Sequence, residues 1–365
     1  MQLKNQIDIE VEIDIDMGKK FDTDNKGITM RLFLSQSKKL LKGVVSLLAS
    51  TLNAIATCIT PAAFAQTYPS KPITLVVPFA PGGNVDIVAR ALAQSLTTVM
   101  GQSVVVDNKV GAGGSIATSF VANAPSDGYT LLVATTNTVS VLPFMMKTQP
   151  YKVSNFQPIS LVATSPLLIE VRADDKRFPD LKSLLDATKK TPESIAVGHS
   201  GQGTSNHLAI LRVEDAAHLS FNIIPYKGST PALTDLMGGQ LDLIVDQITS
   251  SKTFIDAGKL RVLAVLSNER DTNLPGIPTF KEVTKIDLQA STITGLLAPA
   301  GTPPAVITAL NTAVNKVVSD QAFKSRMSAV GSTAKGSSAK EWTDMLEAEA
   351  TNSKRLLEAG KLKPE

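Results

Sequence analysis

The sequence predicts an α/β protein made of two lobes. Short apolar runs alternate with segments in which apolar residues recur every three or four positions, and this alternation is typical of strands that alternate with helices. Two further apolar segments, 159–171 and 292–299, are expected to cross between two such units. The chain of 365 residues is long enough for two ordinary domains.

The first unit is predicted from the alternation between residues 73 and 134. Each strand is a short, nearly continuous apolar run, and glycine-containing turns separate most of the strands from the helices. The predicted strands are 73–79, 103–107 and 130–134, and the predicted helices are 86–100 and 111–124.

The second unit repeats the alternation between residues 181 and 267. The predicted helices are 181–190, 205–217 and 230–237, and the predicted strands are 194–197, 221–225, 241–245 and 262–267. Alternating strands and helices favour mostly parallel sheets that are covered on both faces. Two long helices, 303–319 and 338–357, are expected to complete the chain.

The composition excludes several other classes of protein. Lysine and arginine number 36 against 33 aspartates and glutamates, so the formal net charge is only +3. This near-balance does not favour a nucleic-acid-binding surface, and no nucleic-acid partner is expected. Aliphatic residues are plentiful while aromatic residues make up 5% of the chain, which favours a soluble globular protein over a disordered one.

The N-terminal region has the pattern of a secretory signal peptide at 30–65. Three lysines between positions 38 and 42 precede an apolar stretch at 44–59, and the small residues Ala63 and Ala65 follow it. This order predicts export to the periplasm and cleavage after Ala65.

Two alternatives to a cleaved signal peptide are weaker. The apolar stretch is shorter than the ~20 residues that a membrane span needs. A lipoprotein signal ending at Cys58 is a minor alternative, because Thr57 stands where glycine or alanine is preferred. Residues 1–29 are interpreted as a non-native or disordered extension, with translation starting at Met30.

Seven motifs occur in an order that resembles a known family. They lie at 68–73, 77–86 (VPFAPGGNVD), 108–114, 124–130, 225–229, 257–261 and 297–303. Together they resemble the Bug-type extracytoplasmic solute receptors, the substrate-binding subunits of tripartite tricarboxylate transporters. The resemblance extends over 68–360.

The resemblance implies a periplasmic binding protein with a two-lobed, type II-like fold. Lobe 1 would comprise 66–165 and 292–365, lobe 2 would comprise 166–291, and two crossing strands would join them. Such a receptor captures a small carboxylate and passes it to membrane transporter subunits. It is expected to be a monomer without a cofactor.

Two glycine-containing turns in lobe 1 are predicted to bind the carboxylate. Each turn leads from a strand into a helix, where unpaired N–H groups and the positive end of the helix dipole favour an anion. The alternative is a tight turn that needs glycine only for a positive φ. The predicted contacts are Phe79, Ala80, Gly82, Gly83, Asn84, Asp86 and Gly113.

Lobe 2 is expected to supply a similar glycine- and hydroxyl-rich turn. Its predicted contacts are Gly201, Gly203, Thr204 and Ser205, while Thr135 and Thr136 would face them from lobe 1. Asp246 ends a predicted strand and serves either as a cap or as an acceptor for a ligand amino or hydroxyl group. These loops lack lysine and arginine, so hydrogen bonds are expected to neutralise the anion.

The sequence lacks the complete motifs of a serine hydrolase and of a dinucleotide-binding enzyme. The segment 198–202 (GHSGQ) misses the second glycine of a nucleophile elbow, and neither 82–83 nor 111–114 supplies the glycines of a dinucleotide-binding turn. His199, His207 and His218 have no metal-ligand spacing, and His207 is expected to be a packed, hydrogen-bonded side chain. The remaining alternatives are a sensory receptor of the same fold and, less favoured, a hydrolase or dehydrogenase; the identity of the carboxylate stays open.

Overall fold

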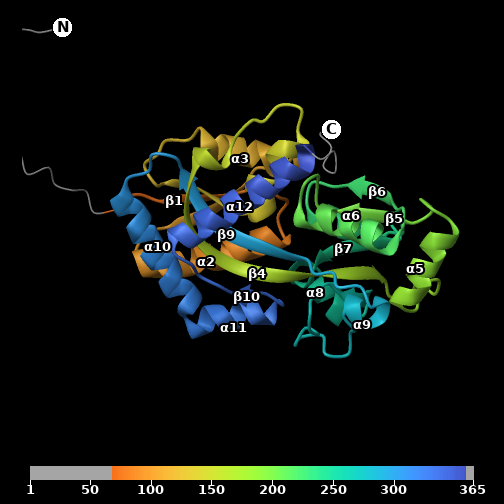
Figure 1. The fold of residues 1–365 in the computed structure, drawn as a ribbon. Helices are drawn as coiled ribbons and strands as arrows, with labels where there is room; N and C mark the ends of the chain where they lie inside the picture. The colour runs from red at the N-terminus through yellow and green to blue at the C-terminus, as the bar shows by residue number, and fades with distance from the viewer. Residues whose placement is uncertain (1–67, 359–365) are drawn as a thin grey trace, which may run out of the picture. The chain divides into compact units, whose positions relative to one another are not determined.

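The computed structural model describes residues 68–358. The predicted extension at 1–29 and the predicted signal peptide at 30–65 lie outside these residues. Within the described part, no helix combines the length and the apolar character that crossing a membrane requires. The chain folds as the mixed α/β structure drawn in Figure 1.

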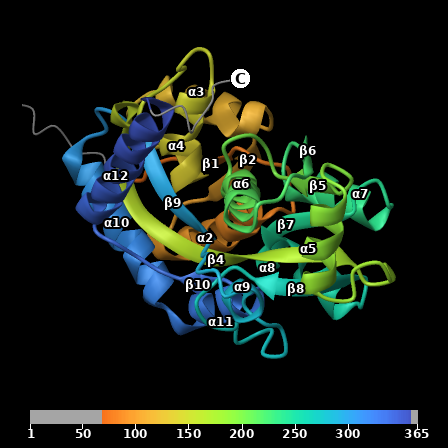
Figure 2. The same cartoon turned by 45° about the vertical axis from the view of Figure 1, so that its right-hand side comes forward.

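The strands form one continuous sheet in the order β2-β1-β3-β9-β4-β7-β5-β6, with β8 and β10 also paired to β4. Their bounds are β1 Ile73–Val77, β2 Val104–Asn108, β3 Thr130–Thr135, β4 Phe156–Arg172, β5 Ala196–His199, β6 Asn222–Pro225, β7 Leu243–Gln247, β8 Leu260–Val265, β9 Ser291–Pro299 and β10 Thr333–Ala334. Figure 2 shows β4 running through both halves of the molecule.

Helices cover both faces of this sheet. Their bounds are α2 Asn84–Met100, α3 Ser115–Ala122, α4 Thr136–Ser140, α5 Leu181–Lys190, α6 Ser205–Ala217, α7 Ser229–Met237, α8 Ile248–Asp256, α9 Phe280–Thr284, α10 Pro304–Ser319, α11 Gln321–Ala329 and α12 Ala339–Glu358. In the first half, α2, α10 and α11 pack on one face, and α3 and α12 pack on the other.

Each half of the sheet has its own hydrophobic core. Alternate residues of β1 point to opposite faces, so Leu75 joins the cluster with α2 and α10 while Val76 joins the cluster that contains Trp342 of α12. In the second half, residues of β4, β5 and β7 pack with Phe178 and with α5 and α6. The clusters of the first half are separate from that of the second half, and this separation defines the two lobes.

The expectation of mostly parallel sheets was only partly met. The pairs β1–β2, β1–β3, β5–β6 and β5–β7 are parallel, but β9 runs antiparallel to β3, and β4 runs antiparallel to β7, β8, β9 and β10. The strands β4 and β9 are antiparallel to each other because the chain crosses between the lobes in opposite directions, along β4 and back along β9. The strand β4 continues without interruption through Ser165 and Pro166, both of which pair with β9.

Candidate functional site

A small cavity lies where the two lobes meet. It has a volume of about 20 Å³, which is just more than the ~10–15 Å³ that one water molecule needs. Residues from both lobes line it: Phe79, Gly83, Asn84, Val85, Thr135, Ser200, Thr204, Ser205, Asn206, Ser229, Gln247 and Thr292. None of these twelve side chains carries a formal charge.

Four helices of nine or more residues begin at this cavity. The residue just before each helix is Gly83 for α2, Thr204 for α6, Gly228 for α7 and Gln247 for α8. The first turn of a helix has unpaired N–H groups and a partial positive charge. Because α2 comes from lobe 1 and the other three come from lobe 2, the cavity receives positive helix ends from both sides.

The cavity wall contains six of the residues that the sequence predicted as ligand contacts: Phe79, Gly83, Asn84, Thr135, Thr204 and Ser205. Thr136 lines a neighbouring, larger hollow, while Ala80, Gly82, Asp86, Gly113, Gly201, Gly203 and Asp246 line neither.

Sequence reasoning did not single out Val85, Ser200, Asn206, Ser229, Gln247 and Thr292. A signal was present for two of them. Ser229 follows Gly228 in one of the family motifs and opens a helix, and Gln247 is the last residue of β7, directly before α8.

Asp86 holds the loop between β1 and α2 from behind the cavity wall. It is 1% exposed and accepts hydrogen bonds from the backbone N–H of Gly82, from Arg90 Nε and from Asn108 Nδ2. These bonds fix the turn in front of Asn84. In this structure Asp86 therefore stabilises the conformation of the loop and does not line the cavity.

Asp246 has a comparable position in lobe 2. Its carboxylate is fully buried and accepts hydrogen bonds from Asn206 Nδ2 (2.8 Å), Ser229 Oγ (2.6 Å) and Ser250 Oγ (2.6 Å). Burial raises the pKa of Asp246, and the hydrogen bonds from these side chains act in the opposite direction. The carboxylate orients Asn206 and Ser229, which do line the cavity.

Glycines allow the two lobes to touch at two places. A Cβ atom on Gly113 of lobe 1 would lie 2.5 Å from the backbone oxygen of Gln202 in lobe 2. On Gly228 of lobe 2, a Cβ would lie 3.0 Å from the backbone nitrogen of Ala80 in lobe 1. Both glycines also have positive φ angles, of 63° and 136°. These glycines therefore serve turn geometry and inter-lobe approach together.

Hydrogen bonds reinforce this contact between the lobes. Thr230 Oγ1 donates to the backbone oxygen of Pro81 at 2.8 Å, and the backbone N–H of Ala80 donates to the oxygen of Lys227 at 3.3 Å. The cavity between these loops holds only about one water molecule, and the loops are joined by hydrogen bonds. We therefore describe this arrangement of the lobes as closed.

Two histidines pack beside the cavity loop of lobe 2. The rings of His199 and His207 stack with their centroids 4.5 Å apart, and both side chains are buried. The backbone N–H groups of Gly201 and Gly203 donate to their Nδ1 atoms. Burial, together with the neighbouring His207, lowers the pKa of His199 to about 3. His207 is thus a packed and hydrogen-bonded side chain, as the sequence predicted.

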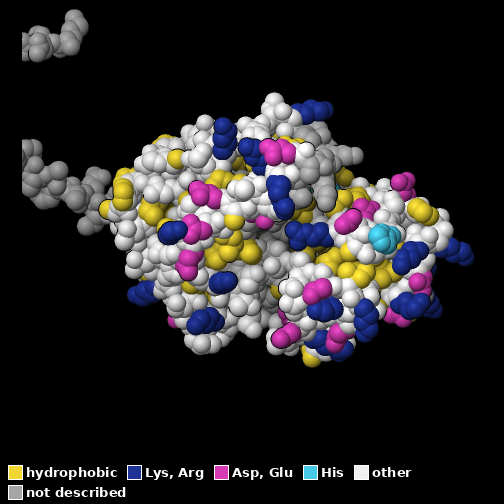
Figure 3. All heavy atoms as spheres, in the orientation of Figure 1, with side chains coloured by type: hydrophobic (Ala, Val, Ile, Leu, Met, Phe, Trp, Pro, Cys, Tyr) yellow, Lys and Arg dark blue, Asp and Glu magenta, His cyan; other side chains and the backbone are white. Residues whose placement is uncertain are grey.

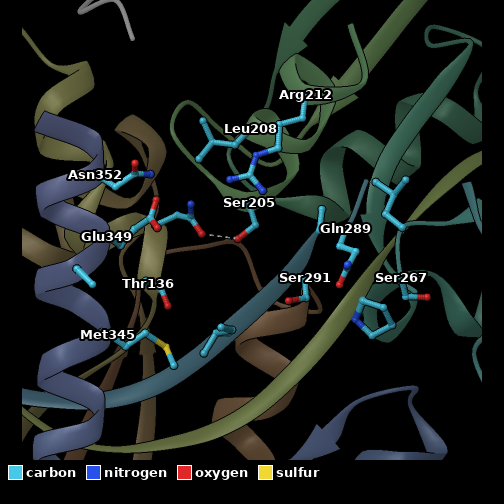
Figure 4. A pocket seen from close by; sticks show the side chains of 16 residues that line it. Thr136, Ser205, Leu208, Arg212, Ser267, Gln289, Ser291, Met345, Glu349 and Asn352 are labelled. Carbon is cyan, nitrogen blue, oxygen red and sulfur yellow. Dashed lines mark hydrogen bonds between the residues drawn. The ribbon is translucent and has the colours of Figure 1, made fainter. Parts of the chain in front are cut away.

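A larger hollow of about 510 Å³ adjoins the small cavity, and Ser205 lines both. Figure 4 shows Arg212 entering it from α6 and Glu349 from α12. Burial raises the pKa of Glu349, and the charge of Arg212 opposes this shift. Ser205 Oγ donates to Asn137 Oδ1 at 2.9 Å across the lobes, and this bond is the dashed line in Figure 4. On the face drawn in Figure 3, acidic and basic side chains are interspersed.

Two α/β lobes joined by crossing strands, with helix N-termini meeting at a cavity between them, define a two-lobed solute-binding protein. The profile of the family described as "Tripartite tricarboxylate transporter family receptor" matches residues 88–362. This chain belongs to that family. Its members are substrate-binding receptors, not enzymes, and are extracytoplasmic.

Three solved structures show the same fold. The periplasmic binding protein BugD is 34% identical to this chain, covers 82% of it with all of its own length, and superimposes with a TM-score of 0.76. The Rhodopseudomonas palustris protein Rpa4515 with adipate is 30% identical, with 82% and 100% coverage and a TM-score of 0.78. MatC from Rhodopseudomonas palustris with bound malate is 28% identical, with 80% and 100% coverage and a TM-score of 0.74.

Proposed function

We propose that this protein captures a small carboxylate between its lobes and presents it to the membrane components of a tripartite tricarboxylate transporter. The observation that carries this proposal is the meeting of four helix N-termini at a cavity without charged side chains. Adipate and malate in two structural relatives support a carboxylate as the ligand class.

Hydrogen-bond donors from both lobes would hold the anion. Serine, threonine and asparagine side chains line the cavity, and the first turns of α2, α6 and α7 contribute residues to its wall. A carboxylate held by several such donors needs no buried lysine or arginine, because the helix ends supply partial positive charge. The anion would therefore be bound by lobe closure rather than by a single ion pair.

Binding requires the lobes to open first. A cavity of about 20 Å³ holds one water molecule and not a dicarboxylate. We propose that lobe 1 (66–165 and 292–365) and lobe 2 (166–291) rotate about β4 and β9. The division is supported by the four larger hydrophobic clusters, each of which draws on residues of one lobe, while a small cluster around Val141 and Met145 also contacts Leu208 of lobe 2.

The rest of the ligand is proposed to extend past Ser205 into the larger hollow. Ser205 lines both spaces, and Arg212 offers a positive charge there for a second carboxylate. A dicarboxylate would thus have its first carboxylate among the helix N-termini and its second beside Arg212. Arg212→Gln should weaken the binding of malate or adipate and leave acetate binding unchanged.

Calorimetric titration and thermal denaturation of the processed protein test this function. Malate, adipate and citrate serve as probes, and the corresponding amides serve as controls. A ligand that binds only the folded state stabilises it by RT ln(1 + [L]/Kd), about 2.7 kcal/mol at a hundredfold excess over Kd. Absence of stabilisation by every carboxylate, or equal stabilisation by the amides, would refute the proposal.

The proposed periplasmic location and transport role have separate tests. N-terminal sequencing of the exported protein should find a chain that begins at Gln66. Deletion of its gene should abolish uptake of the carboxylate that binds. Unchanged uptake together with a lost transcriptional response would favour the sensory role instead.

A further inference from the structure

Two amide side chains in the cavity wall each have a buried atom without a hydrogen-bond partner. These atoms are Asn84 Nδ2 and Gln247 Oε1, and the two residues are 3% and 4% exposed. A buried polar atom left unpaired costs about 1–3 kcal/mol, so such atoms are uncommon in folded proteins. Because both residues line the same cavity, the ligand is the natural partner for both atoms.

The orientation of Gln247 follows from a relay of hydrogen bonds. Asn206 Nδ2 lies 2.8 Å from Asp246 Oδ1 and 2.9 Å from the backbone oxygen of Val245, and both of these atoms are acceptors. The Asn206 amide must therefore present its oxygen to Gln247, whose Nε2 donates to it at 3.0 Å. Gln247 Nε2 also donates to Thr292 Oγ1 at 2.6 Å. The unpaired atom of Gln247 is consequently an acceptor.

Asn84 is oriented in the opposite sense. Its Oδ1 accepts a hydrogen bond from Ser165 Oγ at 3.0 Å, within a buried group of hydroxyls that includes Ser332 and Thr249. The unpaired Nδ2 of Asn84 is therefore a donor. The cavity thus presents a donor from lobe 1 and an acceptor from lobe 2, and the relay through Asn206 fixes the orientation of the acceptor.

We propose that the cleft selects carboxylates that carry a hydroxyl group, with Gln247 as the residue that recognises it. A hydroxyl group both donates and accepts, so one hydroxyl can accept from Asn84 Nδ2 and donate to Gln247 Oε1. This inference rests on the proposed carboxylate-binding function and narrows its ligand.

An ammonium group fits this position less well than a hydroxyl. It brings three donors and a positive charge, whereas the cavity wall offers one unpaired acceptor amide and no acidic side chain. The nearby carboxylate of Asp246 already accepts from three side chains. Desolvating an ammonium beside these groups is costly. Hydroxy acids are thus preferred over amino acids.

Matched ligand pairs test the inference on the unmodified protein. Titration calorimetry compares succinate with malate, glutarate with 2-hydroxyglutarate, and adipate with 2-hydroxyadipate. Within the pair that binds, the hydroxy acid should have a Kd at least tenfold lower. Equal affinity within that pair would overturn the inference while leaving the receptor function intact. Tighter binding of aspartate than of malate would also overturn it. Binding of no carboxylate would refute the proposed function itself.

A variant pair assigns the effect to Gln247. Gln247→Met removes the acceptor with little change in volume, and the advantage of the hydroxy acid should fall to within about twofold. The Kd of the unsubstituted acid should rise by a smaller factor than that of the hydroxy acid. Gln240→Met is the matched control, because Gln240 is exposed and lines no described cavity. If Gln247→Met still binds the hydroxy acid more tightly by the full factor, Gln247 does not recognise the hydroxyl group. Thr292→Val removes one hydrogen bond that orients the Gln247 amide and should reduce the preference for the hydroxy acid partially.

Discussion

Closure of the lobes should depend on the absence of a side chain at Gly113. A Cβ atom there would lie 2.5 Å from the backbone oxygen of Gln202, and real Cβ contacts are essentially never below 3.0 Å. Alanine therefore forces the two loops at least about 0.5 Å apart in the closed arrangement. Overpacking of this kind costs about 1–3 kcal/mol. Because an open form lacks the contact, the cost falls on ligand binding.

Gly113→Ala should raise the ligand Kd by about fivefold to a hundredfold, since each 1.4 kcal/mol corresponds to a factor of ten. The matched control is Gly101→Ala. Gly101 has a φ of 67°, close to the 63° of Gly113, but a Cβ there has nothing within 4 Å. Both variants should lose a similar ~1–2 kcal/mol of unfolding free energy from backbone strain.

Titration calorimetry and thermal denaturation of the two variants, with malate or adipate as the probe, separate binding from folding. Small-angle scattering should show ligand-induced compaction in Gly101→Ala and reduced compaction in Gly113→Ala. Equal Kd values for the two variants would refute the argument that this contact forms during closure.

Three further predictions concern stability. The pKa of His199 is lowered from its ordinary 6.5 to about 3. The free energy of unfolding should therefore drop by about 2 kcal/mol as the pH falls from 7.5 to 5. His199→Gln should remove this pH dependence, whereas His218→Gln should not. The pKa of Glu170 is raised well above its ordinary value, chiefly by burial and also by the charge of Asp246. The free energy of unfolding should therefore decline as the pH rises above about 4.5. Denaturant titrations at several pH values should show that this decline is abolished in Glu170→Gln but not in Glu347→Gln. Gly295→Ala should destabilise by about 1–3 kcal/mol, because its Cβ would lie 2.7 Å from the buried Trp342 ring, and an unchanged melting temperature relative to Gly276→Ala, which has open space, would contradict this.

Most elements could be predicted from the sequence because their residue patterns are local. The helices α5 and α6 have the predicted bounds, and the strand cores of β1 and β3 were found within two residues. The helices α4, α8, α9 and α11 were missed. Two of them, α4 and α9, have only five residues and are too short to show a helical period. The antiparallel pairing of β4 and β9 was missed as well. It depends on how the chain travels between the lobes, which no local pattern records.

In the candidate site, too, the residues found from the sequence are those with a local sequence signal. Sequence reasoning found the turns that open α2 and α6, because glycines and hydroxyls before an amphipathic segment are a local signal. It assigned Asp246 to the ligand because a polar residue at a strand end commonly faces a cleft. The structure places that carboxylate behind the wall, where it orients Asn206 and Ser229.

Gln247 illustrates why the remaining part of the site could not be predicted. Its importance comes from the order Asp246, Asn206, Gln247 in space, which joins the end of β7 to the first turn of α6. An amide can present either a donor or an acceptor, and only its neighbours decide which. The relay begins at two acceptors, the Asp246 carboxylate and the Val245 backbone oxygen, which together direct the nitrogen of Asn206 away from Gln247. In Asp246→Asn the new amide can turn an N–H toward Asn206, which should loosen the orientation of Gln247 and weaken discrimination between hydroxylated and unsubstituted carboxylates, even though residue 246 does not line the cavity.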